Sequence, residues 1–558
     1  MFRRRIRHIQ RYRDIALTLS RYGFGYIAME LGLTDLLSIP KRFFVKYPAS
    51  RKKTTGERIR LFLEELGPTF IKLGQFASTR TDILPPDIIL ELEKLQDDVP
   101  PFSSQEAKEI IEQETGQTIE EIFTEFHEEP LAAASIGQVH FGVLKTGEYT
   151  AIKVRRPNIS KVIETDLEIL NNLAELAEQR LKWASRYQIK NVFEEFSQSL
   201  TQELDYRNEG KNAIKFAKQF EKDPHIRIPK IYEEYSTKRV LMMEYIEGTK
   251  LNDVEQLDHN GYDRYVLAER IVQAMFHQIF IGGFFHGDPH PGNILALPGE
   301  EVLFLDFGLV GRMTPDMKKH LSALVIALIQ QNTDGIIKAI TKMGIVPHDV
   351  NIRKLRADVD SLREKYYDVP LSEISLGEAV HDLFSVTYHH HIHLPADFAL
   401  LGKTLLTMEG VVERLNPEIS IIHIAEPFGR QLIKERFHPK NLAEHFIHDL
   451  AEYGEIITDL PDTIHELKSV IRSGKVRLEM NIPALDYSLK KLDRISNRLS
   501  FSIVLLAFSI IMTGLIVGSA LVRQSTLLWN IPVIEIGFVI ATLMFLLMLY
   551  GIFKSGRF

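Results

Sequence analysis

The chain has 558 residues, too many for one ordinary domain, and its 45% hydrophobic and 25% charged residues are typical of a globular protein with a sizeable core. It contains no cysteine, which excludes disulfides, thiolate nucleophiles and cysteine-ligated metals. A net charge of -7 provides no overall basic field, and we therefore expect no nucleic acid among its partners.

Residues 1–56 alternate basic residues with apolar or aromatic ones, a pattern that predicts a basic amphipathic N-terminal region. Arg21 and Glu30 interrupt its apolar run, and this excludes a secretory signal. Two interpretations remain open. The segment is either a helix that lies on an anionic membrane surface or a solvated helix that packs on the rest of the protein.

Residues 57–130 are predicted to form a helical extension, in which residues 91–126 contribute acidic helices. This extension contains the sequence K-L-G-Q, with Lys72, Gly74 and Gln75. Taken alone, a lysine and a glutamine at this spacing are typical of a surface pair on one face of a helix.

A β-hairpin is predicted next, with strands at residues 139–144 and 149–154 joined by a polar turn. Protein kinases have here a glycine loop, G-x-G-x-x-G-x-V, followed by a strand with the motif V-A-I-K. The three glycine positions fall on Ala132, Ala134 and Gly137. The residues predicted to bind ATP, including the lysine of the strand motif, are Leu131, Ala132, Ala133, Ala134, Ser135, Ile136, Gly137, Gln138, Val139 and Lys153.

A long helical region, residues 159–222, carries Glu203 and Glu209 within two turns. In kinases a helix carboxylate pairs with the strand lysine, which is thereby oriented toward the phosphates of ATP. Both glutamates are candidates for the ion pair with Lys153, and the sequence leaves the choice open.

The sequence H-G-D-P-H-P-G-N at residues 286–293 and D-F-G at residues 306–308 follow in kinase order. Asp288 takes the catalytic position, where a carboxylate accepts the proton of an attacking hydroxyl group or orients a water. Asn293 and Asp306 take the metal positions, because hard oxygen ligands suit Mg²⁺. The alternative, two turns that flank a hairpin, is disfavoured because the other kinase elements precede this stretch in the expected order.

Two groups of histidines admit an interpretation as metal sites. His286 and His290 are four residues apart, but Asp288 and Pro289 between them imply a loop that disfavours a transition-metal site. Residues 389–393 include four histidines, which form either a metal or pH-sensing tract or the end of a helix. We favour the helix end, because only some of these side chains can converge.

Two strongly apolar runs, residues 501–522 and 531–553, are each long enough to cross a bilayer. They predict a C-terminal transmembrane hairpin in contact with membrane lipid. Basic residues flank the hairpin on both sides, whereas the link contains a single Arg523. By the positive-inside rule, we expect a two-pass protein of the cell membrane with its catalytic domain in the cytoplasm.

Most of the chain between residues 66 and 416 resembles the UbiB/AarF (ADCK-type) family of atypical protein-kinase-like proteins. The motifs are K-x-G-Q at residues 72–75, an alanine-rich loop at residues 132–135, E-x-D at residues 203–205 and the catalytic loop at residues 286–293. The resemblance implies an α+β, protein-kinase-like two-lobed fold whose helical N-terminal extension covers the nucleotide site. It also implies a role in isoprenoid quinone (ubiquinone-type) biosynthesis, with quinone-biosynthesis enzymes or lipid intermediates as partners.

The predicted domains, in chain order, are a basic amphipathic region at 1–56, the extension with the K-x-G-Q motif at 57–130, a kinase-like N-lobe at 131–250, a kinase-like C-lobe at 251–430, a helical linker at 431–499 and the transmembrane hairpin at 500–558.

The predicted function is that of a membrane-anchored atypical kinase or ATPase with ATP and Mg²⁺ as cofactors. Alanine at two glycine positions makes the nucleotide loop stiffer, and Gly287 replaces the arginine of the kinase catalytic loop. No A-P-E motif follows D-F-G, so the usual peptide-docking segment is absent. We therefore expect a small or lipid substrate, or ATP hydrolysis. The alternatives are a catalytically silent, nucleotide-regulated scaffold for membrane-bound enzymes and a conventional protein Ser/Thr kinase.

Overall fold

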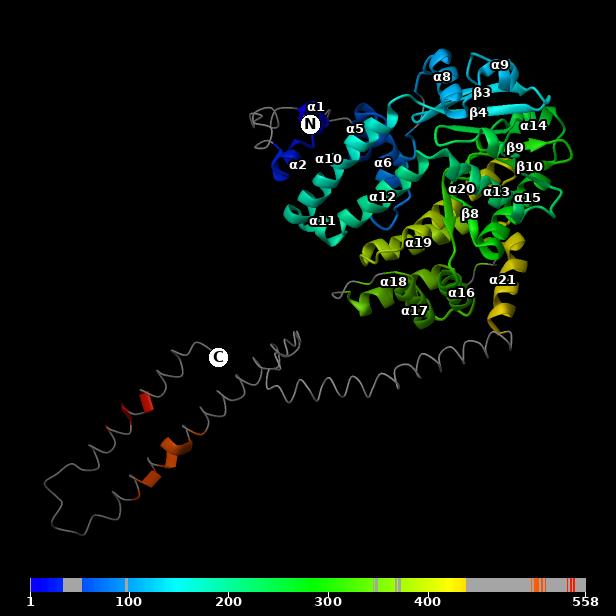
Figure 1. The fold of residues 1–558 in the computed structure, drawn as a ribbon. Coiled ribbons are helices and arrows are strands. Elements are labelled where there is room, and N and C mark those ends of the chain that lie inside the picture. Colours follow the sequence, from blue (N-terminus) through cyan, green and yellow to red (C-terminus); the bar gives the residue numbers. More distant parts are fainter. Residues whose placement is uncertain are drawn as a thin grey trace, which may run out of the picture. The chain divides into compact units, whose positions relative to one another are not determined.

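The computed structural model of the chain describes residues 2–33, 53–95, 99–344, 346, 350–366, 369 and 373–437, together with scattered positions between 503 and 546. The chain divides into two compact units, residues 1–443 and 444–558. Every element described below belongs to the first unit (Figure 1).

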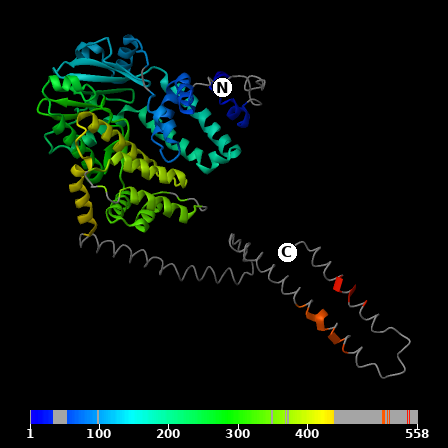
Figure 2. The same ribbon diagram turned by 180° about the vertical axis from the view of Figure 1, so that it is seen from behind.

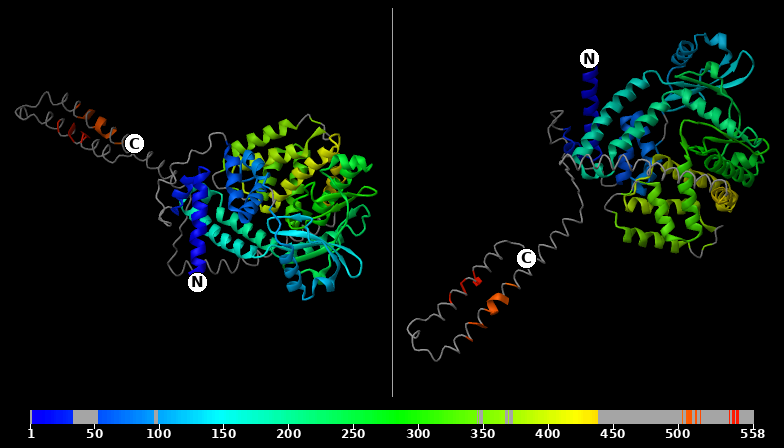
Figure 3. Two further views of the ribbon diagram at one scale, coloured as in Figure 1. Left: turned by 90° about the horizontal axis from the view of Figure 1, so that it is seen from above. Right: turned by 60° about the horizontal axis from the view of Figure 1, so that its bottom comes forward.

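The N-terminal region forms two helices, α1 (Phe2–Arg21) and α2 (Gly25–Glu30). The apolar face of α1 is buried at Ile15 and Ala16, against α5 (Thr55–Leu66) and α10 (Ile159–Arg180). Arg11 adds two hydrogen bonds to the carboxylate of Asp166 on α10, at 2.7 and 2.8 Å. Figure 3 shows α1 beside these helices. Protein therefore occupies this apolar face, as the second interpretation of the N-terminal region predicts.

The extension consists of α5, α6 (Pro68–Ser78) and α7 (Pro86–Leu92). Thr54 caps α5 by accepting a hydrogen bond from the backbone N–H of Glu57, and Gly67, with a φ of 89°, separates α5 from α6. Gly74 lets α6 approach its neighbours, because a Cβ there would lie 2.2 Å from Cδ1 of Leu95. The predicted helical character of this part is confirmed.

The smaller lobe contains a five-stranded sheet with the order β1-β3-β4-β6, in which β2 pairs with β3. Its strands are β1 (Phe123–Phe126), β2 (Ala132–Ala133), β3 (Gly137–Leu144), β4 (Tyr149–Arg155) and β6 (Val240–Glu244). The predicted hairpin is confirmed by the antiparallel pairing of β3 with β4.

The prediction of helix up to residue 126 was wrong, because the acidic stretch ends in a strand. After α8 (Ser104–Thr115) and α9 (Ile119–Ile122), residues 123–126 form β1 and pair with β3. Phe123 is buried with α8 in the core under the sheet. The sheet therefore begins before residue 131, where we had placed the start of the lobe.

The helical region after the hairpin contains α10, α11 (Lys182–Arg186), α12 (Ile189–Glu203) and α13 (Tyr206–Gln219). Asp205 caps α13 by accepting a hydrogen bond from the backbone N–H of Arg207. This cap separates α12 from α13 within the helical region that the sequence predicted. Glu203 consequently ends α12, whereas Glu209 lies in the first turn of α13.

The larger lobe combines short strands with many helices, so that the α+β class is confirmed (Figures 1 and 2). The strands are β5 (Ile226–Arg227), β7 (Thr249–Lys250), β8 (Phe284–His286), β9 (Ile294–Leu297), β10 (Glu301–Phe304) and β11 (Val310–Arg312). The main helices are α14 (Val254–His259), α15 (Arg264–Phe276), α16 (Pro315–Ile329), α17 (Thr333–Met343), α18 (Ile352–Lys365), α19 (Leu376–His389), α20 (Ala396–Leu415) and α21 (Ile421–Phe437).

Among the helices that the structure describes, none is both long and apolar enough to cross a membrane. The predicted transmembrane hairpin, residues 500–558, lies almost wholly outside the described residues.

The histidine-rich stretch at residues 389–393 is the end of α19, as we favoured. His390 is buried, and its Nε2 lies 2.7 Å from a carboxylate oxygen of Asp358, while His391 contacts the hydroxyl group of Tyr187. Within the described residues, no group of three or more His, Asp or Glu side chains is arranged to hold a metal. The metal interpretation of this stretch was therefore wrong.

A buried ion-pair network joins the extension to both α12 and α20. Arg80 donates two hydrogen bonds of 2.9 Å to Asp82 and a third of 2.6 Å to Glu195 on α12. Asp82 is 0% exposed and also accepts a hydrogen bond from the backbone N–H of Leu394, just before α20. The extension is thus fastened to α12 by an ion pair and to the segment before α20 by a buried hydrogen bond.

We expect the substitution Asp82→Ala to lower the free energy of unfolding of this unit by about 1–3 kcal/mol, because it removes the buried carboxylate that accepts two hydrogen bonds from Arg80 and leaves only the more exposed Glu195 as its partner. The exposed pair of Arg356 and Asp334 offers a matched control, and Asp334→Ala should change the stability little. Urea unfolding followed by circular dichroism measures both. Equal midpoints for the two variants would contradict the role of the buried network.

Candidate active site

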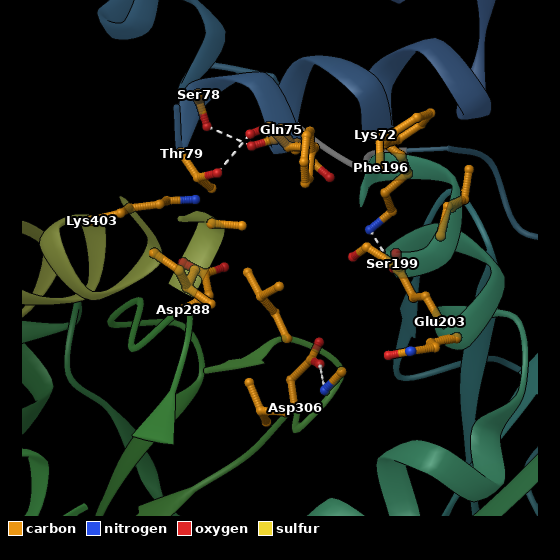
Figure 4. Close-up of a pocket in the computed structure, with 18 of the residues that line it drawn as sticks. Lys72, Gln75, Ser78, Thr79, Phe196, Ser199, Glu203, Asp288, Asp306 and Lys403 are labelled. Atoms are coloured by element: carbon orange, nitrogen blue, oxygen red, sulfur yellow. Dashed lines mark hydrogen bonds and ion pairs between the residues drawn. The ribbon is translucent and has the colours of Figure 1, made fainter. Parts of the chain in front are cut away.

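A cavity of about 1220 Å³ lies between the extension, α12, α13, the catalytic loop and α20 (Figure 4). Seven of the residues predicted from the sequence line it: Lys72, Gln75, Glu203, Glu209, Asp288, Asn293 and Asp306. Segments far apart in the chain therefore converge on one space, and the extension forms one of its walls.

Lys153 on β4 is held by Glu209 and not by Glu203. Its Nζ lies 2.9 Å from both carboxylate oxygens of Glu209 and 3.9 Å from Oδ2 of Asp306. Burial lowers the pKa of Lys153, but the carboxylates of Asp306 and Glu209 outweigh burial and hold that pKa well above its usual value. Burial raises the pKa of Glu209 to about 6, although Lys153 opposes the shift. At neutral pH the two groups form an ion pair.

Glu203 instead pairs with Lys72 of the extension, whose Nζ lies 2.7 Å from Oε1 of the glutamate. Gln75, one turn further along α6, donates a hydrogen bond of 3.3 Å to the carbonyl oxygen of Leu95. Both residues line the cavity, as the family resemblance of the K-x-G-Q motif implied, and they do not form an isolated surface pair. Lys72 connects α6 to the end of α12.

His286 is a structural part of the catalytic loop. It is fully buried, its Nδ1 accepts a hydrogen bond from the backbone N–H of Asp288, and its Nε2 lies 2.9 Å from the carbonyl oxygen of Leu305. Both ring nitrogens are thus engaged with the backbone, which excludes the interpretation of His286 and His290 as metal ligands. The histidine ring fixes the backbone on which Asp288 stands.

Asp306 itself has a backbone φ of 55°, in the left-handed region. Its Oδ1 accepts a hydrogen bond from the backbone N–H of Gly308, and Lys153 is the main cause of a lowered pKa of this carboxyl group. Phe307 is buried against Phe216 of α13, with ring centroids 5.1 Å apart. The aromatic ring points into the core, and the carboxylate is left facing Lys153 and the cavity.

The donor set of the cavity suits Mg²⁺. The carboxylate of Asp306 is ionised, and the amide group of Asn293 donates its N–H to the carbonyl oxygen of Asp288, which leaves the amide oxygen available. Hard oxygen ligands of this kind are those that Mg²⁺ prefers. These two residues would hold the ion, which would neutralise phosphate charge beside Lys153.

The alanine-rich loop is tied to the extension by Arg156. This side chain donates hydrogen bonds to the carbonyl oxygens of Ala134, Val99 and Pro100, at 2.9, 3.2 and 2.7 Å. At Gly137 a Cβ would lie 2.2 Å from the hydroxyl group of Tyr206, so glycine is required for close packing. The loop is therefore held by its neighbours as well as stiffened by its alanines.

The nine loop residues predicted to bind ATP are not equivalent. Ser135, Ile136 and Gln138 are buried, and Gln138 exchanges hydrogen bonds with the backbone of Phe102. Leu131, by contrast, is 50% exposed. Ile136 packs with residues of α10 and α12, so that the side chains of Ile136 and Gln138 both contact protein, a difference that the motif alignment did not reveal.

Gly287, which replaces the kinase arginine, makes room for α20. A Cβ at this position would lie 3.1 Å from Cδ2 of Leu400 and 2.9 Å from Cγ of Leu309. Thr404, one turn after Leu400, donates its hydroxyl hydrogen to the carbonyl oxygens of His286 and Gly287, at 3.4 and 3.3 Å. Helix α20 thus takes the space that an arginine side chain would need.

The charged residues of the cavity that the sequence analysis missed include Glu93 and Lys403. Burial raises the pKa of the Glu93 carboxyl group. The charge of Lys403 lowers this pKa, whereas the charge of Asp288 raises it. A sequence signal for Lys403 existed, since it interrupts an otherwise apolar run of α20.

Three family models match the chain. Residues 94–340 match an ABC1 atypical kinase-like domain, residues 359–420 match a UbiB helical domain, and residues 483–554 match an ABC1/UbiB kinase-like C-terminal domain.

Similar proteins occur in several bacteria. An "Uncharacterized protein in hydrogenase 1 5'region" of Clostridium pasteurianum is 31% identical over 98% of this chain and 99% of its own length. A "Probable protein kinase UbiB" of Marinobacter nauticus is 35% identical over 84% of this chain and 86% of its own length. That of Aliivibrio fischeri is 34% identical, with shares of 82% and 86%.

A solved structure described as "The complex structure of Rv3197-erythromycin from Mycobacterium tuberculosis" is 24% identical to this chain. The similarity covers 66% of this chain and 93% of that structure's own chain, with a TM-score of 0.45.

The full-length match to the curated relatives, together with the three family models, leads to one conclusion. The chain belongs to the ABC1/UbiB family of atypical kinase-like proteins.

Proposed function

We propose that this protein is a membrane-anchored phosphoryl transferase or ATPase that uses Mg-ATP and supports isoprenoid quinone biosynthesis. One observation supports the enzymatic part of this proposal. Lys153 is held by Glu209 beside Asp306, and Asp306 shares one cavity with Asp288 and Asn293. A protein that only displayed surfaces to partners would not need this arrangement of charges.

Each residue has a defined chemical task in this proposal. Lys153 neutralises the α- and β-phosphates, and Mg²⁺ on Asp306 and Asn293 neutralises the charge toward the γ-phosphate. Asp288 accepts the proton of the attacking hydroxyl group or water. Phosphoryl transfer needs little else from the protein, because positioning and charge stabilisation supply most of the catalysis.

The acceptor is a small molecule, a lipid or water. The extension forms a wall of the cavity and is fastened at Lys72, at Asp82 and at Arg156, so an extended peptide has no open groove beside Asp288. The absence of an A-P-E motif after D-F-G supports the same inference.

The quinone and membrane parts rest on other support. Relatives at 34–36% identity carry the name UbiB, and the family resemblance links such proteins to ubiquinone biosynthesis at membranes. The apolar runs at residues 501–522 and 531–553 supply the length that a bilayer crossing needs.

The substitution Asp288→Asn should reduce ATP turnover by the purified protein in lipid by about 10²–10⁴-fold, because the proton acceptor is lost. Its affinity for ATP should remain near that of the wild type, and Asp334→Asn on the exposed face of α17 serves as a control of equal charge. In cells that lack the native chain, Asp288→Asn should also fail to restore the quinone content that the wild type restores.

Unchanged turnover in Asp288→Asn would overturn the catalytic assignment. Loss of turnover with full restoration of quinone would favour the scaffold alternative. Transfer of labelled phosphate to added proteins would favour a conventional Ser/Thr kinase.

The pH profile of ATP turnover should have an acid limb, a fall in turnover at low pH. Burial raises the pKa of Glu209 to about 6, so the carboxylate is ionised above this pH and takes up a proton below it. Turnover should therefore fall as the pH drops through about 6, since Lys153 loses its anchor. Steady-state rates between about pH 5 and 8 measure this.

In Glu209→Gln, turnover at neutral pH should fall by up to about 100-fold, and the acid limb should disappear because no titrating anchor remains. The exposed Glu413→Gln on α20 should retain the limb of the wild type. An unaltered limb in Glu209→Gln would assign the titration to another group.

Removal of residues 500–558 should release the protein from the membrane fraction, because the two apolar runs supply the main anchor. Alkaline carbonate extraction of cells that express the full chain or the truncated chain measures the effect. Complete retention of the truncated chain in the pellet would show that the N-terminal region or another surface is the principal anchor.

A further inference from the structure

Helix α20 is aligned with the catalytic loop at two points one turn apart. Leu400 packs where Gly287 leaves space, and the hydroxyl group of Thr404 donates to the carbonyl oxygens of His286 and Gly287. Lys403, between these two contacts, lines the cavity together with Asp288. Figure 4 shows its side chain extending from α20 into the cavity on the side of Asp288.

Two lysines of the site are already committed to carboxylates, since Lys153 pairs with Glu209 and Lys72 pairs with Glu203. Lys211 of α13 and Lys403 of α20 also line the cavity. Lys403 forms no ion pair of hydrogen-bonding distance with any residue that the structure describes, and it interacts electrostatically with Glu93 of the extension. Its charge is thus available to a ligand of the cavity.

The catalytic loop itself supplies no permanent cation next to Asp288. The two residues that follow are Pro289 and His290, and Nδ1 of His290 is engaged by the backbone N–H of Gly292. Negative charge in phosphoryl transfer spreads over the three equatorial oxygens of the transferred group. A cation on the acceptor side of that group stabilises this charge, whereas Lys153 and the metal ligands act from the nucleotide side.

We propose that Lys403 is a catalytic residue that contacts the γ-phosphoryl group during its transfer, a role that α20 supplies in place of the catalytic loop. This rests on the proposed use of Mg-ATP. The bond between the γ-phosphorus and the β,γ-bridging oxygen breaks, and its electron pair leaves with ADP. A new bond joins phosphorus to the acceptor oxygen, whose proton passes to Asp288. Lys403 exchanges no atoms in this step.

Substitution of Glu93 provides a second test, because its expected effect is opposite to that of substituting Lys403. Its carboxylate lies close enough to both Asp288 and Lys403 to interact with them electrostatically. A negative charge here repels the γ-phosphate and offsets part of the positive charge of Lys403. Removal of the two side-chain charges should therefore change the preference for ATP over ADP in opposite directions, which general damage to the fold would not do.

The experiment measures the dissociation constants of Mg-ATP and Mg-ADP and the ATP turnover of the full-length protein in lipid vesicles. Lys403→Met should lower turnover by about 10²-fold or more and weaken ATP binding by about tenfold, with ADP binding unchanged. Lys403→Arg should recover part of the turnover, since it keeps the charge. Glu93→Gln should strengthen ATP binding over ADP binding by about threefold.

Lys354→Met, an exposed lysine on α18, is the matched control and should match the wild type. Equal losses of ATP and ADP affinity in Lys403→Met, or a wild-type turnover in this variant, would overturn the assignment. A wild-type protein that binds ATP without turning it over would instead refute the proposed function. The two failures are therefore distinguishable.

Discussion

The arrangement of the cavity depends on the ion pair between Lys153 and Glu209. The lysine is on a strand of the smaller lobe and the glutamate is on α13, so the pair fixes a helix relative to the sheet. Asp306 is 3.9 Å from the same ammonium group, and Phe307 fills the space under α13. Burial disfavours an isolated charge, so the ammonium group of Lys153 and the carboxylates of Glu209 and Asp306 stabilise one another. This contact couples the two lobes at one point.

The capping of α13 by Asp205 has a consequence for the whole site. By ending α12 at Glu203 and starting a new helix, it directs two glutamates of one short stretch toward different lysines. Glu209 serves the nucleotide lysine, and Glu203 serves Lys72 of the extension.

The site differs from that of kinases in two structural elements, helix α20 and the extension. Gly287 permits α20 to touch the catalytic loop, where kinases place an arginine, and Arg156 connects the alanine-rich loop to the extension. The buried pair of Arg80 and Asp82 fastens the extension to α12 and α20. The walls of the cavity beside Asp288 are thus fixed by charges and by close packing, on which the proposal of a compact acceptor rests.

The amino-acid sequence by itself determined the hairpin and the order of the kinase elements, because turn residues and motif spacing are local properties of the chain. It also singled out Lys153, Asp288, Asn293 and Asp306, and the structure places the last three at one cavity, with Lys153 beside Asp306. It did not reveal β1, because a four-residue strand next to acidic helices becomes a strand only through pairing with β3.

Only the tertiary structure decided which glutamate holds Lys153, that Lys72 lines the cavity, and that Glu93 and Lys403 belong to it. The physical reason is the same in each case. These contacts join residues more than fifty positions apart, and charge partners at such distances are set by the packing of whole helices, which no local pattern encodes.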